Sequence, residues 1–235
     1  ILMNTNQFVL ILLLFSVKTL KAQIYHRFYP SNFGTEWQIT NFTKKGILQS
    51  SIEAKIVSIK PIDSTGFEAV VEQVFLNKKD VETGANTYRF RSQNNKLFID
   101  MLGILPPQIL GAYQNMELVA VGKMVEFPDS MVFGQKLPDA TVEMQAKSGS
   151  SIVTKLQFFM TNRVVSGSEP LITAAGSFNN CLRIDYDLET RVGAVVSKRK
   201  CSVWLADNVG MVKTEFFKKK KLEGSQQLTA FRQRF

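Results

Sequence analysis

Alternating hydrophobic and polar residues recur along most of the chain and predict β-strands. In the segment 181–188, CLRIDYDL, the apolar residues Leu182, Ile184, Tyr186 and Leu188 share one face and the charged residues between them share the other. Successive side chains of a strand point to opposite sides of a sheet, so this pattern is typical of a strand with one buried and one solvated side. Similar β-branched and aromatic stretches predict strands over residues 36–42, 47–59, 66–76, 87–91, 96–101, 116–127, 141–145, 152–165, 176–188, 194–205, 209–217 and 226–231.

Turn-forming residues separate these stretches, for example at 43–46, 63–66, 147–150 and 223–225. Connections of hairpin length, without long helical patterns, predict a mainly β domain with an antiparallel sheet. We find no internal repeat and no Gly/Ser linker, so residues 23–235 are expected to form a single β-rich domain.

One apolar segment interrupts the strand pattern. Residues 102–116, LGILPPQILGAYQNM, contain Pro106 and Pro107, which exclude a central strand and favour a helix that begins near them. We therefore expect a short apolar helix or loop that packs on the sheet.

The N-terminal part of the chain predicts export. Residues 8–17, FVLILLLFSV, form an apolar run in which Ser16 is the one polar residue, and the small Ala22 follows it. About ten apolar residues are too few for a membrane-spanning helix, which needs about twenty, but they match the apolar core of a secretory signal peptide. We expect residues 1–22 to be a signal peptide cleaved before Gln23, and the exported protein to lie in the periplasm or the outer envelope.

The positive charge is moderate and lies in short clusters. Without residues 1–22 the chain has 27 basic and 20 acidic residues, and its basic residues gather at 44–45, 78–79, 198–200 and 218–221, near predicted turns or strand ends. Such runs are usually solvated turns and strand edges. The alternative is attraction to an anionic surface such as phospholipid head groups, that is, peripheral membrane association. We expect no nucleic-acid partner, because the aromatic residues do not interleave with the basic clusters.

Composition excludes several kinds of chemistry. A chain of 235 residues that is 45% hydrophobic and 21% charged is globular. Its single histidine and two cysteines provide almost no ligands for a metal site or a cofactor. The histidine, His26, lies in a predicted terminal segment, and no G-x-S-x-G motif accompanies it. Asp185 and Asp187 share one strand face at a spacing of about 7 Å, which falls in the range of glycosidase carboxylates, but a solvated strand face explains them equally well. We therefore expect a protein that is not an enzyme.

The two cysteines, Cys181 and Cys201, are disulfide candidates in an oxidising compartment. If the strands 176–188 and 194–205 form a hairpin centred on Arg191, the two residues lie directly opposite each other, nearly close enough for a disulfide. The same register sets Arg183 opposite Arg199, an unfavourable pair that argues for a bulge or a shifted register.

Three groups of residues, in order along the chain, resemble the TapB-like family of exported proteins of Bacteroidota. They are 28–38 with 41–46, 165–169 with 173–178 and Cys181, and 204–213. The resemblance implies a β-rich envelope protein with a curled antiparallel sheet, similar to the half-barrels of periplasmic lipoprotein carriers. Glu169, Thr173 and Gly176 belong to these motifs and either mark a site or support turns, since Gly176 permits unusual backbone angles and Pro170 restricts its neighbour.

Three functions remain open after these exclusions. The first is a carrier or sensor of a lipid or other apolar ligand, lined by the apolar segment 102–116 on the concave side of the sheet; its candidate lining residues are Leu105, Ile109, Leu110 and Tyr113. The second is a structural or assembly protein that binds an envelope protein through a sheet edge. The third is a hydrolase, which the composition disfavours.

Overall fold

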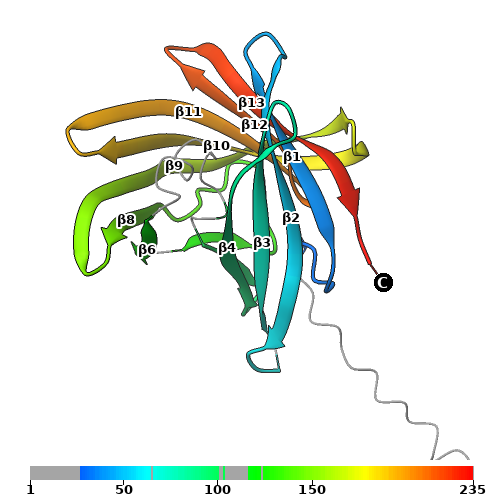
Figure 1. Ribbon diagram of the computed structural model, residues 1–235. Helices are drawn as coiled ribbons and strands as arrows, with labels where there is room; N and C mark the ends of the chain where they lie inside the picture. The colour runs from blue at the N-terminus through cyan, green and yellow to red at the C-terminus, as the bar shows by residue number, and fades with distance from the viewer. Residues whose placement is uncertain (1–26, 65, 101–102, 104–115, 123, 235) are drawn as a thin grey trace, which may run out of the picture.

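The computed structural model (Figure 1) describes residues 27–64, 66–100, 103, 116–122 and 124–234. Within these ranges, no helix has the length and apolar character needed to cross a membrane. The predicted signal peptide and His26 lie outside the described residues. So does most of the predicted apolar helix, including Leu105, Ile109, Leu110 and Tyr113, whose predicted role stays a prediction.

The described part of the chain forms one antiparallel sheet of thirteen strands, which confirms the mainly β fold. Its strands are β1 (Glu36–Thr43), β2 (Leu48–Pro61), β3 (Phe67–Asn77), β4 (Glu82–Gln93), β5 (Lys96–Ile99), β6 (Glu117–Gly122), β7 (Val125–Pro128), β8 (Ala140–Ser148), β9 (Ser151–Thr173), β10 (Gly176–Val192), β11 (Val195–Ala206), β12 (Gly210–Lys218) and β13 (Lys221–Arg232). Their order in the sheet is β6-β8-β9-β10-β11-β12-β13-β1-β2-β3-β4-β5-β7.

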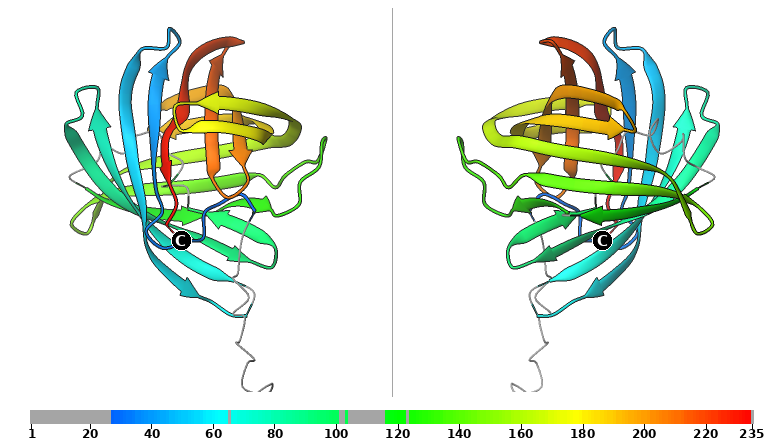
Figure 2. Two further views of the ribbon diagram at one scale, coloured as in Figure 1. Left: turned by 90° about the vertical axis from the view of Figure 1, so that its right-hand side faces the viewer. Right: turned by 90° about the vertical axis from the view of Figure 1, so that its left-hand side faces the viewer.

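The sheet curls until its two ends approach each other, as Figures 1 and 2 show. Its first and last strands, β6 and β7, are consecutive in the chain and are separated by two residues. Three peptide steps span about 11 Å at most, so the end of β6 and the start of β7 must lie close together. The alternating apolar residues of the strands then face a common interior, where side chains such as Ile56, Phe90, Leu156 and Ile184 are buried.

The segment before β1, residues 27–35, folds into this interior. The carbonyl oxygen of Arg27 accepts a hydrogen bond from the amide of Asn208, and the amide of Gly34 donates one to the carbonyl of Ile56. Between these two anchors, Phe28 is buried in the core and Tyr29 packs against it. This segment therefore brings aromatic side chains into the interior of the curled sheet.

Several strands, such as β4, β9, β10 and β13, are longer than their sequence patterns suggest, but most strands lie where the patterns place them. The largest differences are the stretch 116–127, which forms the two strands β6 and β7, and the strand predicted over 152–165, which continues to Thr173 in β9. Hydrogen bonding to a long neighbouring strand extends β9 beyond the region where its own residues alternate.

The disulfide predicted between Cys181 and Cys201 is not formed, and the predicted hairpin register is wrong. Val192 pairs with Val195, so the turn consists of Gly193 and Ala194 rather than residues centred on Arg191, and Cys201 lies opposite Tyr186. Gly193 has a φ of 56°, a backbone conformation that suits glycine in a tight turn. Cys201 faces the main core, whereas Cys181 belongs to a separate small cluster with Trp204, and both thiols are free and buried.

Charge pairing explains why this register is preferred. Lys198 lies opposite Glu189 and its Nζ is 2.9 Å from a carboxylate oxygen of that residue. Lys200 lies opposite Asp187, at 2.8 Å between the charged atoms. The register predicted from the cysteines would have opposed two arginines, so the observed one replaces a repulsive pair with two attractive pairs.

Candidate functional site

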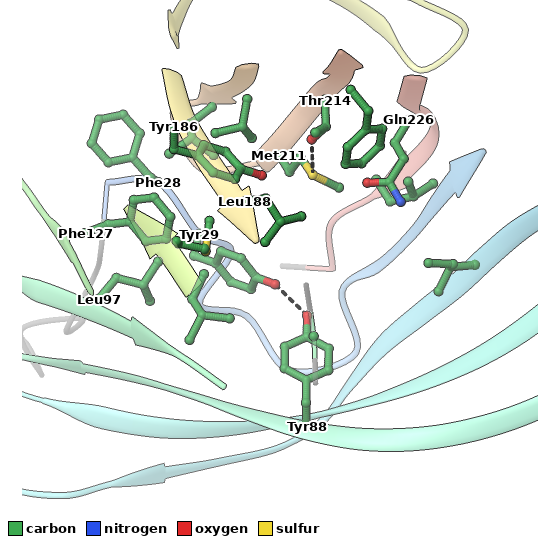
Figure 3. A pocket seen from close by; sticks show the side chains of 18 of the residues that line it. Phe28, Tyr29, Tyr88, Leu97, Phe127, Tyr186, Leu188, Met211, Thr214 and Gln226 are labelled. Atoms are coloured by element: carbon green, nitrogen blue, oxygen red, sulfur yellow. Dashed lines mark hydrogen bonds between the residues drawn. The ribbon is translucent and has the colours of Figure 1, made fainter. Parts of the chain in front are cut away.

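An apolar cavity of about 110 Å³ lies inside the curled sheet (Figure 3). Its wall combines the N-terminal segment with strands from both halves of the sheet. The residues that line it are Phe28, Tyr29, Trp37, Ile39, Ile52, Gln73, Tyr88, Leu97, Ile99, Gly103, Phe127, Phe158, Met160, Tyr186, Leu188, Thr190, Arg199, Val203, Leu205, Val209, Met211, Thr214, Phe216 and Gln226. A mostly apolar wall with a few polar groups is typical of a pocket for a small molecule.

Two tyrosine hydroxyls meet at this cavity. The Oη atoms of Tyr29 and Tyr88 are 2.5 Å apart, and Figure 3 shows the two rings pointing toward each other. The ring of Tyr29 also packs against Phe90, with 4.4 Å between the ring centres, and edge-on against Trp37. These contacts fix the position of Tyr29, so the hydroxyl pair is a rigid feature of the wall.

Burial keeps both phenols neutral. It raises the pKa of Tyr29 to about 12 and raises the pKa of Tyr88 well above its usual value. Two neutral hydroxyls carry two hydrogens, and the bond between them uses one. The second hydrogen has no acceptor among the described residues, so the pair can donate a hydrogen bond to a guest molecule.

Gly103 allows Tyr88 to take its position. A Cβ atom at Gly103 would lie 2.5 Å from ring atoms of Tyr88, closer than side chains approach one another. A glycine here lets the backbone lie against the ring and leaves the hydroxyl directed at Tyr29.

Polar and charged groups stand at another part of the cavity wall. The Nε of Arg199 donates a hydrogen bond of 2.7 Å to a carboxylate oxygen of Glu223, and both side chains are about one-third exposed. On β13, the strand that also carries Glu223, Gln226 donates a buried hydrogen bond to Asn41. The ion pair is therefore partly exposed, whereas the tyrosine hydroxyls are buried.

A second hollow, an open groove of about 650 Å³, runs beside β1, β2 and β13. Among its charged residues, Glu36 accepts from Lys55 at 3.1 Å and also from Arg232, whereas Glu53 and Glu72 form no ion pair with a described residue. These ion pairs hold the pKa of Glu36 below its usual value. Because the groove is open and its basic residues are already paired with Glu36, the more enclosed cavity is the better candidate site.

The family-motif residues Glu169, Thr173 and Gly176 have structural contacts and do not line the cavity. Glu169 accepts a hydrogen bond of 2.6 Å from the indole nitrogen of Trp204. Thr173 accepts one from the amide of Ala175 in the turn between β9 and β10, and Gly176 follows with a φ of 138°. The structure thus places all three at one end of β9 and β10, where they support a turn and a buried indole.

The carboxylates Asp185 and Asp187 are both engaged by donors. Asp185 accepts hydrogen bonds from Arg183 and Ser202, and Asp187 accepts from Lys200 and Asn162. The bond from Lys200 is the main reason that the pKa of Asp187 is lowered, opposite to what a catalytic acid needs. No cluster of three or more metal-ligating side chains occurs in the part of the chain that the structure describes.

Sequence reasoning missed the aromatic residues that build the site. Phe28 and Tyr29 belong to one of the family-like motifs, which does not place them in the interior; two adjacent aromatic residues before Pro30 in a polar region are nevertheless a usable signal. The partner of Tyr29 could not be found in this way, because Tyr88 is 59 residues away in the chain.

Comparisons with known proteins identify relatives at the level of fold. The model of the family described as DUF3108-like matches residues 32–228. A proposed exported protein with a YmcC-like fold from Bacteroides fragilis superposes with a TM-score of 0.77 and 18% identity, covering 89% of this chain and 100% of its own. A proposed lipoprotein from Parabacteroides distasonis has a TM-score of 0.76 and 20% identity, covering 88% of this chain and 99% of its own. A search of curated proteins finds no match.

Proposed function

This chain belongs to the DUF3108-like family, and from the geometry of its cavity we propose that it is a non-enzymatic envelope protein that carries or senses an apolar ligand. The observation that carries this proposal is an enclosed, largely apolar cavity with a fixed pair of tyrosine hydroxyls in its wall. Close-packed interiors rarely contain empty space of this size, because each lost contact is unfavourable. A ligand would restore those contacts.

The wall also indicates the class of ligand. A cavity of about 110 Å³ is suited to a small ring or to the end of an aliphatic chain, because engineered apolar cavities of about 150 Å³ bind benzene. The unused hydroxyl hydrogen favours a ligand with one acceptor oxygen, such as an alcohol, an ester or a carboxylic acid. We therefore propose a short or partly inserted apolar ligand with a single oxygen-bearing group.

Location in the periplasm or outer envelope is part of the same proposal. The predicted signal peptide, the resemblance to the TapB-like family and the descriptions of two structural neighbours as an exported protein and a lipoprotein all support it. The resemblance to the TapB-like family stays a prediction.

An assembly role through a sheet edge has less support. The end strands β6 and β7 have six and four residues, and β7 includes Pro128, which cannot donate to an added strand. Short edges that carry proline are typical of sheets that resist pairing with another strand.

The test measures binding of a series of straight-chain alcohols, from butanol to dodecanol, by isothermal titration calorimetry on the purified protein. Each added methylene that enters the cavity should strengthen binding by about 0.8 kcal/mol, and the gain should stop once the cavity is full. Replacing Leu188, which lines the cavity, by Trp should fill it and weaken binding at least tenfold. Ile172→Trp, at an exposed position, is the matched control and should leave affinity unchanged.

Two results would contradict the proposal: affinity that rises along the alcohol series without a limit, as surface adsorption would give, or equal loss in both variants. If neither result is found, mass spectrometry of apolar extracts from protein purified out of its native envelope would identify the natural ligand.

A further inference from the structure

The sheet topology brings five hairpin turns to one end of the strands. These turns join β1 to β2, β3 to β4, β8 to β9, β10 to β11 and β12 to β13. Each pair is antiparallel, and so are the ladders that connect one pair to the next, so all five turns lie at the same end. In Figure 1 they fan across the upper and left sides of the molecule, while the turn from β2 to β3 lies at the bottom.

Lysines gather at this end. We call the following nine residues the basic rim: Lys44, Lys45, Lys78, Lys79, Lys147, Lys218, Lys219, Lys220 and Lys221. None of them forms an ion pair with a residue that the structure describes, whereas Lys198 and Lys200, further along β11, pair with Glu189 and Asp187. Asp80 shares a turn with Lys78 and Lys79, and the exposed Glu82 begins the next strand. Nine lysines beside these two carboxylates leave the rim with a net positive charge.

Exposed aliphatic side chains accompany these lysines. Seven large hydrophobic residues in or beside the same five turns are exposed, namely Ile47, Leu48, Val81, Ile152, Val153, Val195 and Val196. Two of them, Val195 and Val196, follow the turn between β10 and β11, which has no lysine of its own. Val195 is 69% exposed. This end therefore combines exposed lysines with exposed aliphatic side chains, the two features of a surface that binds at a lipid interface.

The opposite end of the strands differs in charge. Its turns, at 62–66, 94–95, 174–175 and 207–209, contain Asp63 and Asp207 and no lysine or arginine. A solvated turn of a β protein does not require lysine, since these turns use Asn, Ser, Thr and Gly instead. Single lysines do occur beside this end, with Lys60 near the end of β2 and Lys96 at the start of β5, where it pairs with Glu126. The two ends therefore differ in the number of lysines, and the adjacent lysines 44–45, 78–79 and 218–221 all lie at one of them.

We propose that the basic rim docks on an anionic lipid surface, with lysine ammonium groups at the phosphates and the aliphatic side chains at the boundary of the acyl region. Each lysine near such a surface contributes an attraction that fades within a Debye length, so several lysines held in one rim act together. This interaction does not depend on the cavity, and it turns the edge of the molecule that carries the rim toward the membrane.

The experiment is sedimentation of the purified protein with vesicles of phosphatidylcholine containing about a quarter phosphatidylglycerol, compared with phosphatidylcholine alone. We expect binding to the anionic vesicles that weakens steeply with added salt. The rim variant Lys44→Glu with Lys45→Glu should bind at least about tenfold more weakly than the parent. The control variant Lys60→Glu with Lys136→Glu makes the same change in net charge at exposed lysines outside the rim and should bind within about twofold of the parent.

A second pair of variants tests the aliphatic side chains without changing charge. Val195→Ser should weaken binding to anionic vesicles severalfold, and Ile172→Ser, exposed at the opposite end of the strands, should not. Circular dichroism and the thermal midpoint verify that all variants remain folded. Equal losses in rim and control variants would overturn the proposal, and so would binding that is the same with and without phosphatidylglycerol, or no vesicle binding at all.

Discussion

The guanidinium group of Arg163 donates a hydrogen bond of 2.9 Å to the backbone carbonyl of Glu126. Arg163 lies in β9, near one end of the sheet, and Glu126 lies in β7, the strand at the other end. A second bond, of 2.5 Å, reaches the carbonyl of Pro138, and the guanidinium stacks 4.8 Å from the ring centre of Phe127. One buried side chain thus joins the two ends of the sheet, between which the described residues form no backbone ladder.

Replacing Arg163 by Met should destabilise the protein by about 2 to 4 kcal/mol, because two carbonyl oxygens lose their donor in a buried place. Arg163→Lys should be intermediate, since an ammonium cannot reach two carbonyls with the planar geometry of a guanidinium. Burial lowers the pKa of Arg163 to about 10, so the side chain is still charged at neutral pH. Urea denaturation measures the effect.

The matched control for that prediction is Arg89→Met, which removes an exposed ion pair with Glu68. Its effect should stay below about 1 kcal/mol. If both variants unfold at the same urea concentration, Arg163 does not hold the two ends of the sheet together.

The hydroxyl pair of Tyr29 and Tyr88 predicts a non-additive effect of two substitutions. Tyr88→Phe alone should cost about 1 to 3 kcal/mol, since it leaves the Tyr29 hydroxyl buried without its partner. The double variant Tyr29→Phe with Tyr88→Phe should cost less than the sum of the single changes. Denaturation of the four proteins gives the coupling energy, and strict additivity would mean that the hydroxyls do not interact.

The bond between Glu169 and Trp204 should be visible in fluorescence. Trp204 is buried between two cations, with Arg183 at 5.2 Å and Lys213 at 5.1 Å from the ring, and Glu169 accepts from its indole nitrogen. Glu169→Leu should shift its emission and destabilise the protein by about 1 kcal/mol, whereas Glu169→Gln keeps an acceptor and should change less. A Trp37→Phe background isolates the signal, and an unchanged spectrum in Glu169→Leu would contradict the assignment.

Both thiols should be unreactive in the folded protein. Burial raises the pKa of Cys181 to about 11 and that of Cys201 to about 12, so almost no thiolate is present at pH 8. A thiol reagent such as 5,5′-dithiobis(2-nitrobenzoate) should label neither residue until denaturant is added, and then label both. A disulfide found by non-reducing peptide mapping would show that the register between β10 and β11 differs from the one described.

The same shifts predict loss of stability at alkaline pH. A group whose pKa is higher in the folded than in the unfolded state stabilises the fold below its unfolded pKa, and that contribution disappears as the pH rises. For the two thiols the loss begins near the ordinary thiol value of 9.0 and continues toward pH 11 to 12, and Tyr29 adds to it from its ordinary value of 10.0 upward. Urea midpoints should therefore fall above about pH 9, and less steeply in Cys201→Ala; a midpoint that is constant up to pH 11 would contradict this.

The alternation of apolar and polar residues was sufficient to predict the strands, because it is a local property of the sequence. The alternation at 181–188 and the turn residues around it need only neighbouring positions, and they correctly predicted a strand with Ile184 and Tyr186 facing the core. The mainly β class follows from repeating this observation along the chain.

The register between paired strands was harder to predict, since it depends on two segments of the chain at once. Shifting a hairpin by a few positions leaves the pattern of each strand unchanged, and only the turn at Gly193 and the pairs of Glu189 with Lys198 and Asp187 with Lys200 decide which residues face each other. The predicted disulfide failed for this reason.

The sequence by itself determined that this protein is an antiparallel β domain and that most of its lysine clusters fall near turns or strand ends. Only the tertiary structure decided that the basic turns share one end, that Tyr29 meets Tyr88 at a cavity, and that Arg163 joins the two ends of the sheet. These relationships link residues far apart in the chain, and they arise when curling of the sheet places its strands around a common interior. Local patterns carry no information about such distances, because many folds satisfy the same alternation.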